Sequence, residues 1–196
     1  FVSVVVPCRN EAPFIGLFLN SLLAIDHPRT RMEVTFVDGM STDGTREVIE
    51  RAARRHDFIR VIDNPKLIVP VAMNMGIRRS RGEIIVRMDA HSEFPPDYIA
   101  RCLRLLRETE RAGNAGGRVI NAADGNCPWG RAVAFVTGRF LGVGNGAWRI
   151  SEDPGFVDTV PCGVCRRETF EQVGFFDERL TRNQDNELNA RLQRSG

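Results

Sequence analysis

The sequence predicts an α/β domain with a mostly parallel central sheet that is flanked by helices. Short apolar runs rich in Val and Ile alternate along the chain with longer segments whose apolar residues recur at helical spacing. The strand-like runs are apolar at nearly every position, as expected of strands that are buried on both faces. With 196 residues, of which 42% are hydrophobic, the chain is long enough for one domain with a substantial core.

The first 120 residues carry this alternation most clearly. Strands are predicted at 2–6, 34–37, 59–62, 83–88 and 115–120, and helices at 14–25, after 41–43, at 67–79 and at 98–111. Ser41, Thr42 and Asp43 supply side chains that commonly start a helix. We therefore expect a sheet whose strands are connected by helices over most of this half.

The alternation weakens after residue 120. Residues 121–156 are rich in Gly, Ala and Asn, and 138–146 has the composition of a lid that orders when a ligand binds. A short strand at 157–160, a helix at 168–173 and a last helix beginning near Asp185 are predicted after it. We interpret 1–196 as a single domain in which 121–196 completes a site formed by 1–120.

Composition excludes several classes of protein. The net charge is +2, and no basic block interleaved with aromatic residues indicates nucleic-acid binding. Five cysteines at scattered positions argue against a disulfide framework, and the single CxxC at Cys162–Cys165 favours small buried side chains over a zinc or redox site. No apolar run reaches the roughly 20 residues of a membrane helix, and no signal peptide is visible. The chain begins with Phe1, inside a predicted strand, and not with an initiating Met. We therefore expect it to be part of a longer protein.

Polar residues follow three of the predicted strands. The first strand leads into Pro7, Arg9 and Glu11, the second into Asp38, and the fourth into Asp89 and His91. In open parallel sheets, ligands bind at the carboxyl ends of the strands. Asp89 and His91 are two residues apart, so in an extended segment they point to the same side. A turn aspartate and a packed histidine would be the alternative explanation.

This set of residues suits a nucleotide diphosphate. An arginine and an acid could frame the nucleotide, and Asp38 could accept a hydrogen bond from a base or ribose. Asp89 and His91 could hold a divalent ion that neutralises the diphosphate. The chain has no Walker A loop and no GxGxxG after the first strand, which removes the main support for P-loop and dinucleotide-binding proteins.

Four motifs carry a family resemblance. In order they are VVVPCRNEA, VDGMSTDGT, GEIIVRMDAH and CGVCRRETFEQVGFFDERLTRNQDNELNARL. Across about residues 2–195 they resemble the successive motifs of the inverting glycosyltransferase family 2, which has the GT-A fold. The DAHS and RNQDNELNARL segments look like the subgroup that builds bacterial exopolysaccharides, including succinoglycan-type glucosyltransferases.

The resemblance implies that residues 1–120 form the nucleotide-binding half. Pro7, Arg9 and Glu11 match the loop around the nucleotide, and Asp38 matches the acid that contacts the nucleobase, usually uracil. Asp89 matches a nucleotide-binding position as well as a metal ligand.

The implied metal is Mn²⁺ or Mg²⁺. Asp89 and His91 occupy the D-x-D positions of the family, of which the last binds the metal. Histidine at 91 departs from the usual aspartate, but imidazole is an acceptable Mn²⁺ ligand.

The resemblance makes 121–196 the acceptor and catalytic half. Asp185 matches the acid of the E-D motif and would be the general base, with Gln184 in the Glu position; the alternative is that Asp185 only caps the last helix. Gly163 lies where relatives place the loop beneath the donor sugar. The family's A-R-N-x-G motif is Ala72–Gly76 here, with Met73 in place of the arginine, so that this contact is absent or supplied elsewhere. Arg78 or Arg79 could compensate, but we expect both to be solvated surface residues.

The expected function is transfer of a sugar from a nucleotide-diphosphate sugar, expected to be a UDP-sugar, to a glycan or lipid-linked acceptor in cell-surface polysaccharide synthesis. Relatives of this kind work at the cytoplasmic face of the bacterial inner membrane, so membrane association is expected through regions outside this chain. Two alternatives stay open. One is a non-catalytic module that binds a nucleotide-sugar, and the other is a nucleotidyltransferase, although its glycine-rich loop after the first strand is missing.

Overall fold

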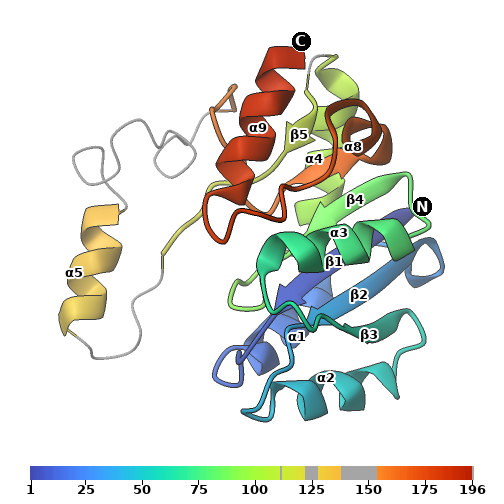
Figure 1. The fold of residues 1–196 in the computed structure, drawn as a ribbon, viewed down its shortest axis with the longest axis vertical. Coiled ribbons are helices and arrows are strands. Elements are labelled where there is room, and N and C mark those ends of the chain that lie inside the picture. Colours follow the sequence, from blue (N-terminus) through green and yellow to red (C-terminus); the bar gives the residue numbers. More distant parts are fainter. Residues whose placement is uncertain (111, 122–127, 138–153, 196) are drawn as a thin grey trace.

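The computed structural model describes residues 1–110, 112–121, 128–137 and 154–195 (Figure 1). The predicted lid at 138–146 therefore lies outside the described residues. The strands are β1 (Val2–Cys8), β2 (Met32–Asp38), β3 (Ile59–Asp63), β4 (Ile84–Arg87), β5 (Asn114–Ala115) and β6 (Val164–Arg166). The helices are α1 (Ile15–Ala24), the 3₁₀ turn η1 (Arg29–Arg31), α2 (Thr45–Ala53), α3 (Val69–Arg79), α4 (Tyr98–Glu108), α5 (Pro128–Thr137), α8 (Arg167–Val173) and α9 (Gln184–Ser195).

The described strands form one six-stranded sheet in the order β3-β2-β1-β4-β6-β5. β1 lies at its centre and pairs in parallel with β2 and β4, and β2 pairs in parallel with β3. β6 is antiparallel to both β4 and β5. The prediction of an α/β fold with a mostly parallel sheet is therefore confirmed.

Helices cover both faces of the sheet, which explains why the strands are apolar at successive positions. Val4 and Val6 of β1 belong to one core cluster, and Val5 between them belongs to the other. The first cluster includes Phe18 and Leu22 of α1, Ile49 of α2, and Ile99 and Leu106 of α4. The second includes Met73 and Ile77 of α3, Phe170 of α8 and Leu188 of α9. Because α8 and α9 pack on the same face as α3, the C-terminal segment reaches the edge where β4 ends.

Two predicted strands after β4 are wrong. The strand expected at 115–120 is limited to Asn114–Ala115, and the strand expected at 157–160 does not form. The side chain of Asn114 donates to the Val160 carbonyl at 3.4 Å, and a Cβ on Gly116 would lie 2.4 Å from Val160 Cγ1. These two segments therefore pack together through side chains, and Val164–Arg166 takes the ladder position beside β4 instead.

Near the amino ends of the central strands, the buried carboxylate of Glu33 links neighbouring segments through hydrogen bonds. Glu33 of β2, which is 5% exposed, accepts hydrogen bonds from the Ser3 hydroxyl at 2.7 Å and from the Arg81 backbone N–H at 2.7 Å. Burial alone would raise the pKa of Glu33, but these hydrogen bonds and the charges of Arg60 and Arg81 lower it. The carboxylate thus ties β1, β2 and the turn before β4 together.

Replacing Glu33 with Gln should lower the free energy of unfolding by about 1–3 kcal/mol at neutral pH, because the arginine charges lose their partner. A depressed folded pKa contributes stability above the unfolded pKa of Glu, and this contribution is lost as pH falls through the folded value. Urea unfolding at neutral and acidic pH measures both effects. The exposed Glu47 of α2, changed to Gln, is the matched control; equal losses in the two variants would contradict the prediction.

Candidate active site at the carboxyl edge of the sheet

Strained backbone is concentrated at the carboxyl edge of the parallel strands. The non-glycine residues with positive φ in the described chain are Asn10, Met40, Leu67, Cys162 and Asn183. They follow β1, β2 and β3, and precede β6 and α9. Such conformations cost about 1–3 kcal/mol each and tend to persist at functional sites. This edge is therefore the best candidate for a site on grounds independent of motifs.

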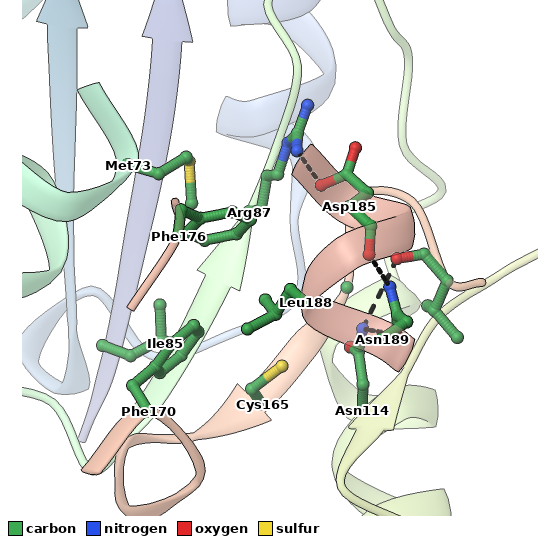
Figure 2. A pocket seen from close by; sticks show the side chains of 12 residues that line it. Met73, Ile85, Arg87, Asn114, Cys165, Phe170, Phe176, Asp185, Leu188 and Asn189 are labelled. Atoms are coloured by element: carbon green, nitrogen blue, oxygen red, sulfur yellow. Dashed lines mark hydrogen bonds and ion pairs between the residues drawn. The ribbon is translucent and has the colours of Figure 1, made fainter. Parts of the chain in front are cut away.

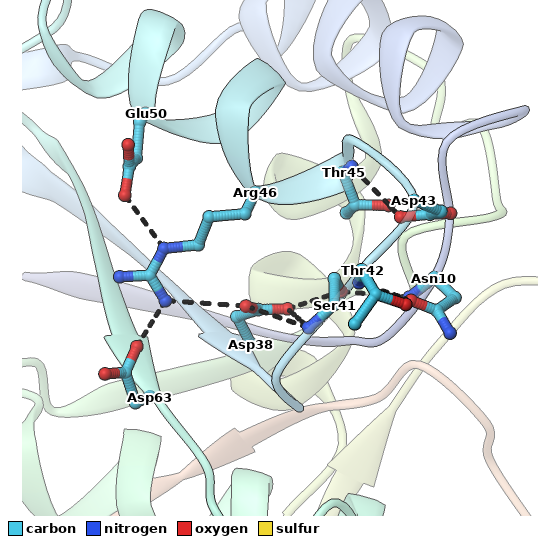
Figure 3. A network of polar contacts seen from close by, with 9 residues as sticks. All are labelled: Asn10, Asp38, Ser41, Thr42, Asp43, Thr45, Arg46, Glu50 and Asp63. Carbon is cyan, nitrogen blue, oxygen red and sulfur yellow. Dashed lines mark hydrogen bonds and ion pairs between the residues drawn. The ribbon is translucent and has the colours of Figure 1, made fainter.

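The loop after β1 is held by side chains from the loop after β2. Backbone N–H groups of Asn10, Glu11 and Ala12 donate to Ser41 Oγ, Thr45 Oγ1 and Asp43 Oδ2, at 2.8–2.9 Å. In return, the Thr42 N–H donates to Asn10 Oδ1 (Figure 3). The hydroxyl and carboxylate side chains of VDGMSTDGT thus shape the loop that carries Arg9 and Glu11.

Asp38 ends β2 in a buried polar network. It is 1% exposed and accepts hydrogen bonds from the Ser41 hydroxyl at 2.5 Å and from Arg46 at 3.4 Å. Arg46 also pairs with Asp63, the register partner of Asp38 on β3, and with Glu50 at 2.8 Å (Figure 3). Two acids and an arginine therefore meet where β2 and β3 end, and sequence reasoning singled out Asp38 alone.

Pro7 and Arg9 occupy different environments. Pro7 is buried inside β1, opposite Val37 of β2, so it belongs to the strand and not to the loop after it. Arg9 is exposed, and its aliphatic stem packs on Gly39, where an added Cβ would lie 3.1–3.3 Å from the Arg9 carbons. Glycine at 39 therefore permits Arg9 to lie across the loop at the rim of the site.

The two predicted metal ligands contact different partners. His91 Nδ1 lies 3.0 Å from Glu11 Oε1, and this hydrogen bond raises the pKa of His91. Asp89 is engaged by Arg87 and by the Cys162 thiol; burial alone would raise its pKa, but Arg87 holds it below its ordinary value. Within the described residues, no group of three or more His, Cys, Asp or Glu side chains is arranged to hold a metal ion.

The cysteine pair serves packing in the described structure. Cys162 and Cys165 are buried free thiols, as are Cys8 and Cys102, and Cys127 lies outside the described residues.

Arg87 joins the strand-end aspartate to the last helix. Its Nε donates to Asp89 Oδ1 at 2.8 Å and its Nη2 to Asp89 Oδ2 at 3.2 Å. Its Nη1 pairs with Asp185 Oδ1 (Figure 2). Sequence reasoning missed this residue because it sits in an apolar strand run. An arginine at the end of a buried strand was nevertheless a signal, since a buried guanidinium needs carboxylate partners.

Asp185 and Gln184 begin α9. Burial raises the pKa of Asp185 and the nearby Asp89 raises it further, whereas Arg87 lowers it; the net direction is upward. Gln184 is half-buried as the first residue of the helix. Asp185 is thus a first-turn helix acid and, at the same time, part of the strand-end cluster.

Gly163 contacts an amide side chain in the described structure. An added Cβ would lie 1.9 Å from Asn114 Oδ1, and the Gly163 carbonyl accepts from the Arg87 N–H at 2.9 Å. The cavity behind these residues, between Met73, Gly163 and Leu188, measures about 20 Å³ (Figure 2). That volume suits one water molecule and not a sugar, so the small glycine here admits the Asn114 amide.

Arg78 and Arg79 do not compensate for the arginine that Met73 replaces. They end α3 at the far edge of the sheet, where Arg78 stacks on the Phe175 ring at 4.8 Å. Met73, by contrast, lines the same cavity as Arg87 and Asp185. The guanidinium near this position comes from β4 instead.

Comparison with protein families identifies the chain. The model of the family described as Glycosyl transferase family 2 matches residues 3–174. The chain belongs to this family. Its motif resemblance to this family is therefore confirmed.

Two curated relatives of this glycosyltransferase align with all or nearly all of it. The succinoglycan biosynthesis protein ExoA of Rhizobium meliloti (strain 1021) is 32% identical over 195 residues, which cover 98% of this chain and 58% of that protein. The dolichyl N-acetyl-alpha-D-glucosaminyl phosphate 3-beta-D-2,3-diacetamido-2,3-dideoxy-beta-D-glucuronosyltransferase of Methanococcus voltae is 27% identical over 203 residues, covering 100% of this chain and 62% of that protein. The chain thus spans about three fifths of the length of these relatives.

Solved structures share the fold. Staphylococcus aureus TarS 1-349 in complex with UDP-GlcNAc superposes with a TM-score of 0.72 at 19% identity, covering 97% of this chain and 52% of that one. The mannosyltransferase PcManGT of Pyrobaculum calidifontis, in complex with GDP-Man and Mn²⁺, gives 0.68 at 24% identity, covering 96% and 50%. The expected GT-A fold is therefore confirmed. Among the described residues, no helix has both the length and the apolarity to span a membrane.

Proposed function

We propose that this family 2 glycosyltransferase transfers a sugar, with inversion, from a nucleotide-diphosphate sugar to a saccharide acceptor. The observation that carries the proposal is the chain of contacts Asp185–Arg87–Asp89, which joins the first turn of α9 to the end of β4. It places a carboxylate with a raised pKa beside the strand end where the family motif expects the diphosphate. A proton acceptor and a leaving-group site within reach of each other are what a single displacement requires.

The nucleotide would lie over the loops after β1 and β2. We assign Arg9, Glu11 and Asp38 to it, with Asp89 toward the diphosphate; Pro7, buried inside β1, would only fix where the first loop starts. The TarS neighbour was solved with UDP-GlcNAc and the PcManGT neighbour with GDP-Man, which supports a nucleotide-diphosphate sugar as donor. We propose a UDP-sugar, with Asp38 facing the base.

The chemistry of Asp89 and His91 fits a divalent ion, Mn²⁺ or Mg²⁺. A carboxylate and an imidazole are few protein ligands, but such sites are commonly completed by substrate phosphates. Binding there would require Asp89 to share its oxygens with Arg87 and His91 to turn from Glu11. The ion would supply positive charge that stabilises the departing diphosphate.

Asp185 would act as general base. It takes the proton of the acceptor hydroxyl as that oxygen forms a bond to the anomeric carbon, and the bond from that carbon to the diphosphate oxygen breaks. The bonding electron pair leaves with the nucleoside diphosphate. A raised pKa suits this role, because a base is most effective when its pKa approaches the working pH. Gln184, half-buried at the start of α9, would border the sugars, whereas Gly163 faces the Asn114 amide.

The acceptor is proposed to be a glycan or a lipid-linked saccharide in exopolysaccharide synthesis at the cytoplasmic face of the inner membrane. The Rhizobium meliloti relative is named for succinoglycan biosynthesis, and the Methanococcus voltae relative for a dolichyl-phosphate-linked sugar. Membrane association would come from segments outside this chain. The remaining alternative is a nucleotide-sugar-binding module without turnover, favoured by Gln184 and His91 as departures from the family motifs.

Calorimetric titration with UDP tests the donor and metal assignments. UDP should bind in the presence of Mn²⁺ and only weakly without it, and His91→Ala should reduce the Mn²⁺ enhancement by at least about tenfold, the lower end of the losses seen when support of a metal site is removed. His56→Ala is the matched control, because His56 lies beside Phe58 just before β3, away from the carboxyl ends of the strands. Full Mn²⁺ enhancement in His91→Ala would remove His91 from the metal site. Binding of another nucleoside diphosphate in place of UDP would overturn the assignment of uracil to Asp38.

A further inference from the structure

Arg87 is the buried cation of the candidate active site. Of the arginines whose exposure the structure describes, it alone is in the buried range, at 8%. Its backbone is fixed by β4, since its N–H donates to the Gly163 carbonyl at 2.9 Å. The Cα of Arg87 is therefore held in place by the sheet. Its guanidinium can act as a fixed point for the carboxylates that contact it.

The guanidinium divides its donors between two carboxylates. Nε and Nη2 form a fork on Asp89, and Nη1 reaches Asp185, which lies 98 residues away in sequence (Figure 2). A planar guanidinium with its donors in fixed directions constrains the orientation of the groups it binds, which an ammonium does not. The arrangement sets both the distance and the relative orientation of the two aspartates.

The two aspartates also need a cation between them. In the described structure, the charged groups that face Asp185 are Arg87 of β4 and Asp89 just after it. Burial and Asp89 both favour the protonated form of Asp185, and Arg87 opposes them. Without Arg87, two carboxylates would face each other in a site with little access to water.

We propose that Arg87 is a positioning residue that holds the Asp185 carboxylate at a fixed place and orientation relative to Asp89, without contacting the sugar itself. The inference rests on the proposed function, because only there is Asp185 the base. It goes beyond that function by making β4 the element that sets the base on α9.

The test compares Arg87→Met and Arg87→Lys with Arg167→Met. Arg167 is a matched control because it also uses three donors, but on the backbone carbonyls of Gly82, Ile77 and Ser80. The Asp185 carboxyl is followed by ¹³C NMR titration and is assigned by its loss in Asp185→Asn. UDP with Mn²⁺ is titrated calorimetrically into the same variants.

We expect the Asp185 pKa to be at least about one unit higher in Arg87→Met than in the wild type, and close to the wild type in Arg87→Lys. UDP affinity with Mn²⁺ should fall in Arg87→Met, because Asp89, which is proposed to hold the ion, loses the fork that orients it. Arg167→Met should change neither quantity. If Arg87→Met does not fold, Arg87→Gln, which keeps a donor without the charge, replaces it in the comparison.

An unchanged Asp185 titration in a folded, uncharged variant would overturn the inference, even if UDP binds normally. Failure of UDP to bind the wild type would count against the proposed donor, while the effect of Arg87 on Asp185 would still be measured. The two proposals therefore fail separately.

Discussion

Replacing Asp185 with Asn should lower kcat by about 10²–10⁴-fold while UDP still binds with Mn²⁺. The loss is the usual contribution of a general base, and asparagine keeps the size of the side chain but cannot accept the hydroxyl proton. UDP affinity should persist because the contacts assigned to the nucleotide lie on the loops after β1 and β2, and not on α9. Steady-state kinetics with a UDP-sugar donor, together with UDP calorimetry, measure the two quantities.

Glu187→Gln separates catalysis from helix capping. Asp185 and Glu187 are the two acids in the first turn of α9, so both favour the helix through its dipole. Only Asp185 faces Arg87 and the end of β4; Glu187 pairs with Arg191. Equal losses of kcat in the two variants would mean that Asp185 serves the helix and not the reaction.

The pH dependence of kcat should also show that Asp185 is the base. The pKa of Asp185 is raised above its ordinary value, so its unprotonated form is lost as pH falls through that raised value. The acidic limb of the kcat profile should therefore lie above the range of an ordinary aspartate. An acidic limb at the ordinary value would indicate a different base.

Gly76→Ala should destabilise the fold by about 1–3 kcal/mol. An added Cβ on this residue of α3 would lie 2.3 Å from Val5 Cγ1, on the central strand, and 3.3 Å from Val37 Cγ2. Val5 is fully buried and β-branched, so it cannot turn away, and overpacking a core typically costs this much. The cost must also exceed the gain of about 1 kcal/mol that Ala brings to a helix interior.

Gly16→Ala isolates that helix gain. Gly16 lies on the exposed side of α1, and an added Cβ there would meet nothing within 4 Å. Urea unfolding should show Gly16→Ala to be as stable as the wild type or up to about 1 kcal/mol more stable. If both variants shift the unfolding midpoint in the same direction, close packing of α3 on β1 is not what requires glycine at 76.

The parallel part of the sheet could be predicted because its signals are local. Runs such as Val2–Val6 are apolar at nearly every position, and this follows directly from burial on both faces. The residues at the ends of these strands could be placed at one edge for the same reason, since parallel strands bring their carboxyl ends together. Asp38 and Asp89 follow from that rule alone, before any side-chain contact is known.

The antiparallel part of the sheet could not be predicted, because two segments of similar composition could each have paired with β4. Val157–Val160 is as strand-like in composition as Val164–Arg166, yet only the latter pairs with β4. Asn114 contacts both segments: its amide occupies the space beside Gly163 and donates to the Val160 carbonyl. A contact between residues some 50 positions apart leaves no local pattern in the chain.

The sequence by itself determined the α/β alternation and the strand ends that carry Asp38 and Asp89, because burial and strand direction act on neighbouring residues. Asp185 was identified from the family motif alone. Only the tertiary structure decided that Arg87 lies between Asp89 and Asp185, that His91 turns to Glu11, and that Arg46 joins Asp38 to Asp63. A buried charge takes as its partner whichever opposite charge the fold brings within reach. That partner is fixed by the packing of α9 and α2 against the sheet, and the spacing of residues along the chain does not encode it.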